Sequence, residues 1–344
     1  MRTPITVGVV GATTRATALT RAFSELPQAE LRWICDDLPR LARVDPSAVT
    51  NWTNRLDDLL IDEDLDAVVF ASTEIAGGGR ALAALAADKH VLVEGPVAFT
   101  SAEADELVSV AERRSRRLMT HSPALLRPGA LRLHRLIDSG VLGEIFYMHA
   151  SRHAQREESG PDVLWDLGVE TVELVLDLLG DQPVEAVARG ESYLGLDRPD
   201  VVFASLGFAT GIKVYLHLSR LDAETAERLS IVGSEGTAVL DGSEPRRGLS
   251  LYLEQQAHGL FNDLTLDPGG HIRYSLPADD STRLGCAGFL TAVRSPSDAD
   301  YARKVTTAIA VVETLGLSCA NDGSTETIAP RTERAKQNVI AFRG

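Results

Sequence analysis

Lysine is scarce in this sequence, and arginine supplies most of the positive charge. Among 344 residues the lysines are Lys89, Lys213, Lys304 and Lys336. Few amines are therefore available for proton transfer or covalent chemistry. The sequence also lacks a P-loop, a Ser–His–Asp order and a cluster of His and Cys residues at metal-binding spacing, so we expect no metal site.

The sequence also contains few cysteines and no long apolar runs. The cysteines are Cys35, Cys286 and Cys319, which are odd in number and widely separated. This pattern indicates buried thiols in a reducing compartment rather than a disulfide framework. No apolar run approaches the ~18–20 residues that a membrane-spanning helix needs, and the N-terminus shows no cleavable apolar segment. We therefore expect a cytoplasmic protein.

The overall composition is typical of a soluble globular protein. Hydrophobic residues make up 44% of the chain and charged residues 24%. Single domains usually contain ~100–200 residues, so the length predicts two domains. The net charge of -15 at pH 7 repels polyanions, which argues against nucleic acid and anionic membrane surfaces as partners.

Residues 1–123 alternate short apolar runs with stretches of helical periodicity, as βαβ units around a parallel sheet do. We expect strands at Ile5–Val10, Leu31–Cys35, Ala67–Ser72, His90–Glu94 and Leu118–His121. We expect helices at Arg15–Leu26, Gly79–Ala87 and Ala102–Arg116, with Thr100 or Ser101 capping the last. Right-handed crossovers then place helices on both faces, which predicts an α/β, Rossmann-like, doubly wound dinucleotide-binding domain.

Residues 124–344 have a different pattern, in which strands follow one another without helices between them. The strands are expected at Glu144–Arg152, Val184–Ser192, Val201–Phe208, Lys213–Leu218, Arg228–Val232, Thr237–Leu240 and Leu249–Leu253. The helices are expected at Pro128–Gly140, Asp162–Leu179, Leu284–Arg294 and Asp298–Ser318. This order predicts an α+β domain with an open, largely antiparallel sheet for substrate and oligomerisation, whose two late helices pack back on the first domain.

A possible nucleotide-binding turn lies at Val7–Ala16, which reads VGVVGATTRA. The usual pattern is G-x-G-x-x-G, whose second glycine lets the pyrophosphate approach the backbone. Gly11, Thr13 and Ala16 stand at the three glycine positions. Because Thr13 places a β-branched side chain beside the phosphates, we expect anion binding at the helix N-terminus to be weakened but retained.

Asp36 and Asp37 follow the second predicted strand. An acidic side chain at this place commonly binds the ribose hydroxyls, which favours NAD over NADP as the cofactor. The alternative is that both aspartates are turn carboxylates, and that the chain binds no cofactor.

Four segments carry a resemblance that covers nearly the whole chain. They are KHVLVEGP (Lys89–Pro96), LIDSGVLGEIFYMHASR (Leu136–Arg152), VLWDLGVETVELVLDLLG (Val163–Gly180) and LSIVGSEGTAVLDG (Leu229–Gly242). Together and in this order they resemble the Gfo/Idh/MocA oxidoreductase family, especially members that act on nucleotide-linked sugars. The resemblance implies a nicotinamide cofactor, a sugar-like small-molecule substrate and a homodimer or homotetramer formed through the open face of the second sheet.

The chain departs from the family at the expected catalytic residues. Members carry Glu-Lys-Pro after the fourth strand, whereas here Gly95 follows Glu94. Members also carry a histidine one helical turn after an aspartate. Asp166 matches that aspartate, and Glu170 stands where the histidine belongs.

Further site residues are implied by their family positions. Ser72 and Glu94 are expected at the cofactor, although Ser72–Gly77 (STEIAG) lacks the usual proline and histidine. Gly95, Arg152 and His153 are expected at the substrate. His121 and His149 are other histidines that could line the cleft for the cofactor and the substrate.

The loss of the lysine leads to alternative hypotheses. Asp166 and Glu170 lie four residues apart on a predicted helix, so one carboxylate could raise the pKa of the other and give a general acid or base. The alternative is a solvated acidic helix face. The sequence thus predicts an atypical member with non-redox acid/base chemistry on a sugar-like molecule, or with no catalytic role. Its competitors are an active NAD-dependent sugar dehydrogenase or ketoreductase with relocated acid/base groups, and a purely structural subunit.

Overall fold

The computed structural model describes residues 3–11, 13–36, 51–77, 79–155, 162–195, 197–243, 246, 248–253, 271–295 and 300–331. The chain forms two compact units. Unit 1 comprises Met1–Leu126, Asp280–Ile309 and Arg331–Gly344, and unit 2 comprises Arg127–Asp279 and Ala310–Pro330. Within the described part of the chain, none of the helices combines the length and the apolar character that crossing a bilayer requires.

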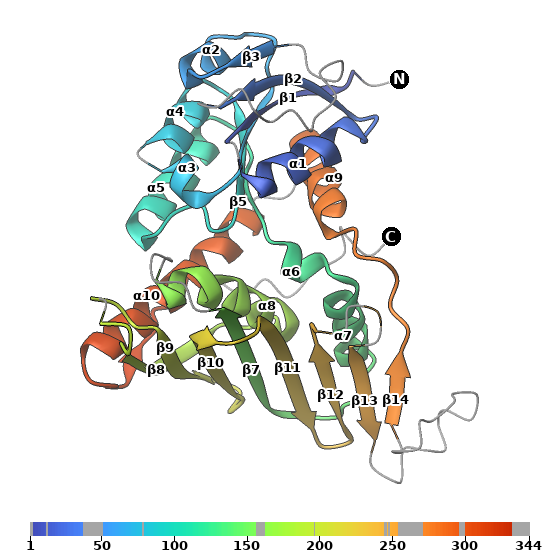
Figure 1. Cartoon of the computed structure of the whole chain (residues 1–344), viewed down its shortest axis with the longest axis vertical. Coiled ribbons are helices and arrows are strands. Elements are labelled where there is room, and N and C mark those ends of the chain that lie inside the picture. The colour runs from blue at the N-terminus through green and yellow to red at the C-terminus, as the bar shows by residue number, and fades with distance from the viewer. Residues whose placement is uncertain are drawn as a thin grey trace. The chain divides into compact units, whose positions relative to one another are not determined.

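Unit 1 is built on a six-stranded parallel sheet with the order β3-β2-β1-β4-β5-β6 (Figure 1). The strands are β1 (Ile5–Val10), β2 (Ala29–Cys35), β3 (Asn51–Thr53), β4 (Ala67–Phe70), β5 (His90–Glu94) and β6 (Leu118–His121). The order reverses between β1 and β4, where dinucleotide-binding sheets place their ligand. The structure confirms the predicted doubly wound α/β fold.

The central strands of this sheet are buried on both faces. Every residue of β4 is buried, and in β1 only Thr6 is partly exposed. Strands covered on both sides consist of nearly continuous apolar runs. This is why their bounds could be located closely from the sequence.

Helices α1 (Thr14–Ser24) and α9 (Ser281–Arg294) pack against one another in unit 1 (Figure 1). Phe23 and Phe289 share one buried core with Val7 and Val9 of β1. A segment from late in the chain therefore completes the core of the parallel sheet. The other helices are α2 (Leu56–Leu60), α3 (Thr73–Ala76), α4 (Arg80–Ala86), α5 (Ser101–Arg113) and α6 (Pro123–Leu126). Thr100 caps α5 as predicted, because its hydroxyl accepts a hydrogen bond from the Glu103 amide at 3.2 Å.

Unit 2 contains a nine-stranded sheet with the order β14-β13-β12-β11-β7-β10-β9-β8-β15. The strands are β7 (Ile145–Gln155), β8 (Pro183–Glu191), β9 (Val201–Phe208), β10 (Lys213–Asp222), β11 (Ala226–Gly233), β12 (Gly236–Asp241), β13 (Leu249–Leu253), β14 (His271–Tyr274) and β15 (Glu326–Thr327). Of the described neighbours only β7 and β10 are parallel. The predicted open and largely antiparallel sheet is confirmed.

The two faces of the unit 2 sheet differ. In β7, Met148 and Ala150 are buried, whereas Tyr147 and His149 are exposed on the other face. Helices α7 (Pro128–Asp138) and α8 (Val169–Leu179) pack on the covered side, and α10 (Asp300–Ala320) contributes residues to both units. The alternation of burial with a period of two residues fixes which side chains face the helices.

The segment predicted as one helix over residues 162–179 is divided. Leu164–Gly168 forms a π-helical turn, and α8 begins directly after it. A π turn inserts an extra residue into the helical repeat and is frequent at functional sites. The four-residue spacing between Asp166 and Glu170 therefore spans the π turn and the start of α8, which changes the geometry assumed from the sequence.

Candidate active site

The nucleotide turn begins where β1 ends. Gly11 has φ +120°, a conformation that favours glycine, and its amide donates to the Cys35 carbonyl at 2.9 Å. This bond joins the ends of β1 and β2. Asp36 follows Cys35 directly and is tied by its amide to the Thr53 carbonyl at 2.9 Å. Gly11 and Asp36 thus lie at the carboxyl ends of neighbouring strands, while Asp37 lies outside the described residues.

Thr13 is the N-cap of α1. Its hydroxyl accepts a hydrogen bond from the Ala16 amide at 3.1 Å. The threonine that departs from the glycine pattern therefore satisfies one of the amides at the helix N-terminus. A bound phosphate must share this helix end with the Thr13 side chain, which fits the weakened anion binding expected from the sequence.

Ser72 and Glu94 belong to the same edge of the sheet. Ser72 lies just beyond β4 and is partly exposed, and Glu94 is the last residue of β5. β4 and β5 are parallel neighbours, with Phe70 paired to Val93. The cofactor candidates from three strands therefore gather at the carboxyl edge, as expected for a dinucleotide-binding sheet.

Gly95 adopts a backbone conformation that few other residues share. Its φ is +90°, and an added Cβ would lie 3.2 Å from the Thr73 hydroxyl oxygen. Thr73 cannot move away freely, because that hydroxyl donates to the Pro96 carbonyl at 2.7 Å. The backbone at Gly95 therefore disfavours any side chain at this position.

Glu94 is paired with His121 at the end of β6. Glu94 Oε2 contacts His121 Nδ1, and the two side chains are 8% and 1% exposed. The parallel register of β5 and β6 places the two residues directly opposite one another. The sequence singled out both residues but did not pair them. The sequence offered one signal for this pairing, since each residue ends one of two consecutive predicted strands.

Unit 2 contains two ion pairs between its sheet and the helical segment over it. Arg152 on β7 pairs with Glu170, and Arg220 on β10 pairs with Asp166. Arg152 follows Ala150 at two-residue spacing, and so lies on the helix-covered face. Arg220 was missed in the sequence, although it continues the buried alternation of β10 in the same way.

A third arginine extends this charged cluster. Arg127, the residue before α7, donates to Glu227 of β11 at 2.6 Å. Glu227 and Asp166 also lie close enough to Arg152 to interact with its charge. Arg127 Nε also lies 4.0 Å from a carboxylate oxygen of Asp279. Three guanidinium groups thus lie among four carboxylates, and the cluster offers many hydrogen-bond donors and acceptors.

The placement of Asp166 and Glu170 changes their interpretation. Glu170 is paired with Arg152, and Asp166 is paired with Arg220. The acid/base hypothesis assumed that the two carboxylates interact with one another, whereas the contacts in the described residues join each of them to a guanidinium group of the sheet.

His153 lies on the opposite face of β7 from Arg152, because adjacent strand residues alternate in direction. Its Nε2 is 3.1 Å from Nδ1 of His217, whose ring stacks on Phe203 with centroids 4.3 Å apart. Phe203 is 58% exposed on this open face. His153 and Arg152, predicted together as substrate contacts, are thus separated by the sheet.

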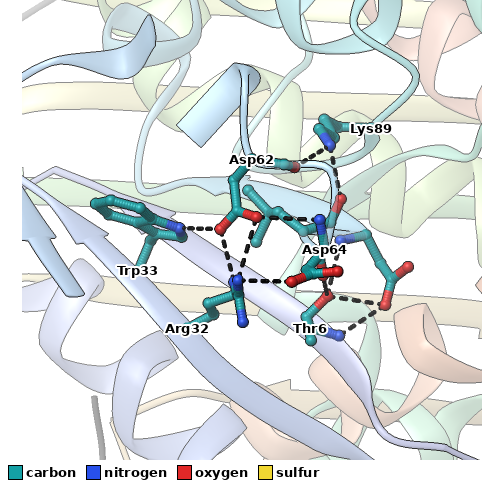
Figure 2. A network of polar contacts seen from close by, with 8 residues as sticks. Thr6, Arg32, Trp33, Asp62, Asp64 and Lys89 are labelled. Atoms are coloured by element: carbon teal, nitrogen blue, oxygen red, sulfur yellow. Dashed lines mark hydrogen bonds and ion pairs between the residues drawn. The ribbon is translucent and has the colours of Figure 1, made fainter. Parts of the chain in front are cut away.

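The lysine side chains that the structure describes have polar partners of their own. The Lys89 ammonium is buried and donates to the carbonyls of Asp62 and Leu65 at 2.6 and 2.8 Å (Figure 2). Burial lowers the pKa of Lys89, but it lies before β5, at the edge away from Gly95. Lys213 is ion-paired with Glu185 on the unit 2 sheet. The Lys304 side chain and Lys336 lie outside the description.

Figure 2 shows that Lys89 belongs to a polar network around Asp62. Asp62 accepts hydrogen bonds from Arg32 Nε and Trp33 Nε1, both at 2.6 Å. The hydrogen bond from Arg32, followed by that from Trp33, outweighs burial and lowers the pKa of Asp62 to about 2. The network therefore connects β2 to the segments that lead into β4 and β5. We assign it a structural role.

Two family models together match most of the chain. One is described as an oxidoreductase family with an NAD-binding Rossmann fold and matches residues 5–122. The other is described as the GFO/IDH/MocA C-terminal domain and matches residues 130–239. The chain belongs to the Gfo/Idh/MocA oxidoreductase family.

Similar members of the Gfo/Idh/MocA family have names that refer to sugars and polyols. Inositol 2-dehydrogenase 2 of Saccharopolyspora erythraea is 36% identical over 147 residues, which is 41% of this chain and 43% of the relative. 1,5-Anhydro-D-fructose reductase of Ensifer adhaerens is 28% identical and covers 65% of this chain and 71% of its own length. The chain therefore spans less than half of the first relative and about seven tenths of the second.

A solved structure of the same fold extends over nearly the whole chain. The UDP-N-acetylglucosamine 3-dehydrogenase of Acidithiobacillus ferrooxidans has a TM-score of 0.77 and 22% identity, and the match covers 92% of this chain and 98% of that one. At this identity the likeness supports the fold alone.

The nucleotide half of the Gfo/Idh/MocA fold is suited to NAD. Unit 1 is an NAD-binding Rossmann domain by its family model, and its Gly11 retains the positive φ of the tight turn. Gly11 and the start of α1 would hold the diphosphate, and Asp36 would hold the adenosine ribose. When bound, a nicotinamide dinucleotide supplies a hydride donor or acceptor to the site.

Proposed function

We propose that this chain is an NAD-dependent oxidoreductase of a sugar or polyol whose acid/base group differs from the lysine and histidine usual in its family. The observation that carries the proposal is the tight turn at Gly11, with φ +120°, ending β1 beside Asp36. A turn of this conformation lets a diphosphate approach the helix N-terminus.

Asp36 favours NAD over NADP. A carboxylate at the end of the second strand accepts hydrogen bonds from the ribose hydroxyls and repels a 2′-phosphate. The position of Asp36 directly after Cys35, the last residue of β2, supports this preference.

The charged cluster of unit 2 suits a ligand rich in hydroxyl groups. Arg152, Arg220 and their carboxylate partners combine donors and acceptors at partly buried positions. Keeping several partly buried charges on one sheet face costs desolvation free energy, and such clusters often occur at functional sites. The mixture of opposite charges favours a neutral sugar or polyol over a strongly ionic molecule.

The chain's own residues must move a proton if an alcohol and a carbonyl are to interconvert. Gly95 has no group for this task, and Asp166 and Glu170 are each paired with an arginine. We therefore expect slow turnover, about 100–1000-fold below that of a member with its oxyanion-stabilising lysine.

Cofactor binding tests the proposal first. The purified full chain is titrated with NADH and with NADPH while the nicotinamide fluorescence is followed. We expect NADH to bind more tightly than NADPH. Asp36→Ala should raise the Kd for NADH about tenfold, because a charged hydrogen bond is lost. Glu30→Ala, an exposed position on the same strand, is the matched control.

Turnover is then tested on the molecules named by the relatives. Inositol and UDP-N-acetylglucosamine are offered with NAD, and 1,5-anhydro-D-fructose with NADH. A slow, protein-dependent change in nicotinamide absorbance with one of them supports the proposal. If neither NADH nor NADPH binds, the proposal fails, and a non-redox or structural role is favoured.

We also propose that the chain forms a homodimer or homotetramer through the open face of the unit 2 sheet. Phe203, Tyr147 and Tyr215 are 58%, 41% and 45% exposed there. Large aromatic side chains gathered on one sheet face are typical of interfaces rather than of a solvated surface.

A further inference from the structure

Glu94 and His121 form a buried carboxylate–imidazole pair at the carboxyl edge of the unit 1 sheet. His121 Nδ1 contacts Glu94 Oε2, and His121 Nε2 lies 3.3 Å from the Thr282 carbonyl oxygen in the first turn of α9. The His121 side chain is 1% exposed and that of Glu94 8%. The imidazole of His121 is therefore fully buried, and the carboxyl group of Glu94 lies nearer the protein surface.

The contacts of the ring determine how many protons the pair holds. A carbonyl oxygen only accepts hydrogen bonds, so the contact with Thr282 is a hydrogen bond in the tautomer that carries a hydrogen on Nε2. In that tautomer the contact between Nδ1 and the Glu94 carboxyl group uses a second hydrogen, either on the ring or on the carboxyl oxygen. The pair then contains one proton more than a neutral imidazole beside an ionised carboxylate.

The two protonation states of the pair differ in charge. With the shared proton the pair is neutral overall, and without it the pair carries one negative charge. The titratable group facing the pair from α9 is Cys286, and burial, followed by the charge of Glu94, raises the pKa of its thiol. Cys286 therefore stays neutral and does not compensate the charge.

Helix α9 packs closely against the imidazole of His121. A Cβ at Gly285 would lie 2.4 Å from Cδ2 and 2.5 Å from Nε2 of His121. Only a glycine lets the helix approach the ring this closely. His121 is thus held between β5 and α9, with its two nitrogens aimed at fixed partners.

We infer that Glu94 and His121 hold one exchangeable proton beside Gly95, and that Glu94 passes it to the oxygen of the substrate while His121 positions and reloads Glu94. In this step the O–H bond of the Glu94 carboxylic acid breaks and an O–H bond forms on the substrate oxygen. The pair is left as a carboxylate and a neutral imidazole, which regain the proton from water. The inference rests on the proposed function, in which the nicotinamide supplies the hydride.

The protonation state of the pair sets the direction of the reaction that it supports. The pair with its proton gives that proton to a carbonyl oxygen and so supports reduction. Oxidation of an alcohol requires the pair without it, because the hydroxyl proton must be accepted.

The protonation state is measured without turnover. The ring nitrogens of His121 and the carboxyl carbon of Glu94 are followed by NMR from pH 6 to 10 on labelled full chain, with His121→Gln and Glu94→Gln assigning the signals. We expect either a doubly protonated ring or a protonated carboxyl group at pH 7. A neutral ring beside an ionised carboxylate at pH 7 overturns the inference, whether or not NADH binds.

Variants then separate proton transfer from a structural role. Glu94→Gln should lower the rate of carbonyl reduction about 100-fold or more and remove its pH dependence, with the Kd for NADH nearly unchanged. His121→Gln should shift the pH profile. His134→Gln is the matched control, since His134 is paired with Asp177 at 2.9 Å in unit 2. If Glu94→Gln keeps both the rate and the pH profile while NADH still binds, the inference fails and the proposed function stands.

Discussion

Arg152 on β7 is ion-paired with Glu170 in the first turn of α8, and this contact links the unit 2 sheet to the helix covering it. The two side chains are only 17% and 22% exposed. Glu170 is therefore part of the charged cluster that lies between the sheet and the helical segment of unit 2.

Removing the charge of Glu170 should destabilise unit 2. Glu170→Gln leaves Arg152 partly buried with less compensation, so we expect the free energy of unfolding to fall by about 2 kcal/mol. Urea denaturation followed by circular dichroism measures this change. Glu185→Gln breaks the exposed pair with Lys213 and should cost less than about 0.5 kcal/mol. Equal losses in both variants would contradict a special role for the Arg152 pair.

Restoring the lysine should not restore the family's chemistry. Gly95 has φ +90°, so Gly95→Lys is expected to lower the free energy of unfolding by about 1–2 kcal/mol. Gly95→Ala should cost a similar amount, since the backbone rather than the amine causes the strain. We expect no gain of redox activity in Gly95→Lys combined with Glu170→His. A stable double variant with faster nicotinamide turnover would refute this.

His90 should make the protein sensitive to mild acid. Burial lowers the pKa of His90 from 6.5 to about 4, and its Nδ1 accepts a hydrogen bond from the Arg117 amide at 2.9 Å. Between these two pH values the unfolded chain binds a proton that the native state does not. The free energy of unfolding should therefore fall by roughly 3 kcal/mol as the pH drops from about 6.5 to about 4.

Urea midpoints at several pH values measure the contribution of His90. His90→Gln should lose less stability than the natural chain over this pH range, because the titrating group is gone. His149→Gln, at an exposed position on β7, should keep the original acid dependence. Identical pH curves for the natural chain and His90→Gln would rule out His90 as the cause.

The open face of unit 2 should mediate self-association. Phe203→Glu puts a charge among exposed aromatic side chains, so light scattering after size exclusion should show a shift to monomer. Tyr193→Glu changes another residue that is 71% exposed but lies outside the strands, and should leave the mass unchanged. A monomeric natural chain would contradict the proposed oligomer.

The sequence predicted the regular elements of both units closely. Val201–Phe208 and Leu249–Leu253 have the bounds that hydrophobic alternation indicated, and β1 and β5 match as well. The short elements β3, α2, β14 and β15 were missed. They contain two to five residues, too few for a period to be recognised.

The candidate site was predicted in part. Gly11, Asp36 and Glu94 were placed correctly at strand ends, because a parallel sheet brings its carboxyl edges together. The π turn at Leu164–Gly168 could not be predicted, since one extra residue in a helical repeat leaves no clear mark in the hydrophobic pattern. The partners of Asp166 and Glu170 were missed because they lie on strands far away in the sequence.

The sequence by itself determined the strands and helices, the parallel order of unit 1 and the absence of an amine at Gly95, because these depend on local periodicity and on residue identity. The tertiary structure decided which charged groups meet. Glu94 and His121 are 27 residues apart, and Arg220 and Asp166 are 54 apart. Only strand register and helix packing bring such groups into contact, and those contacts decide which groups can hold a proton and which remain ionised.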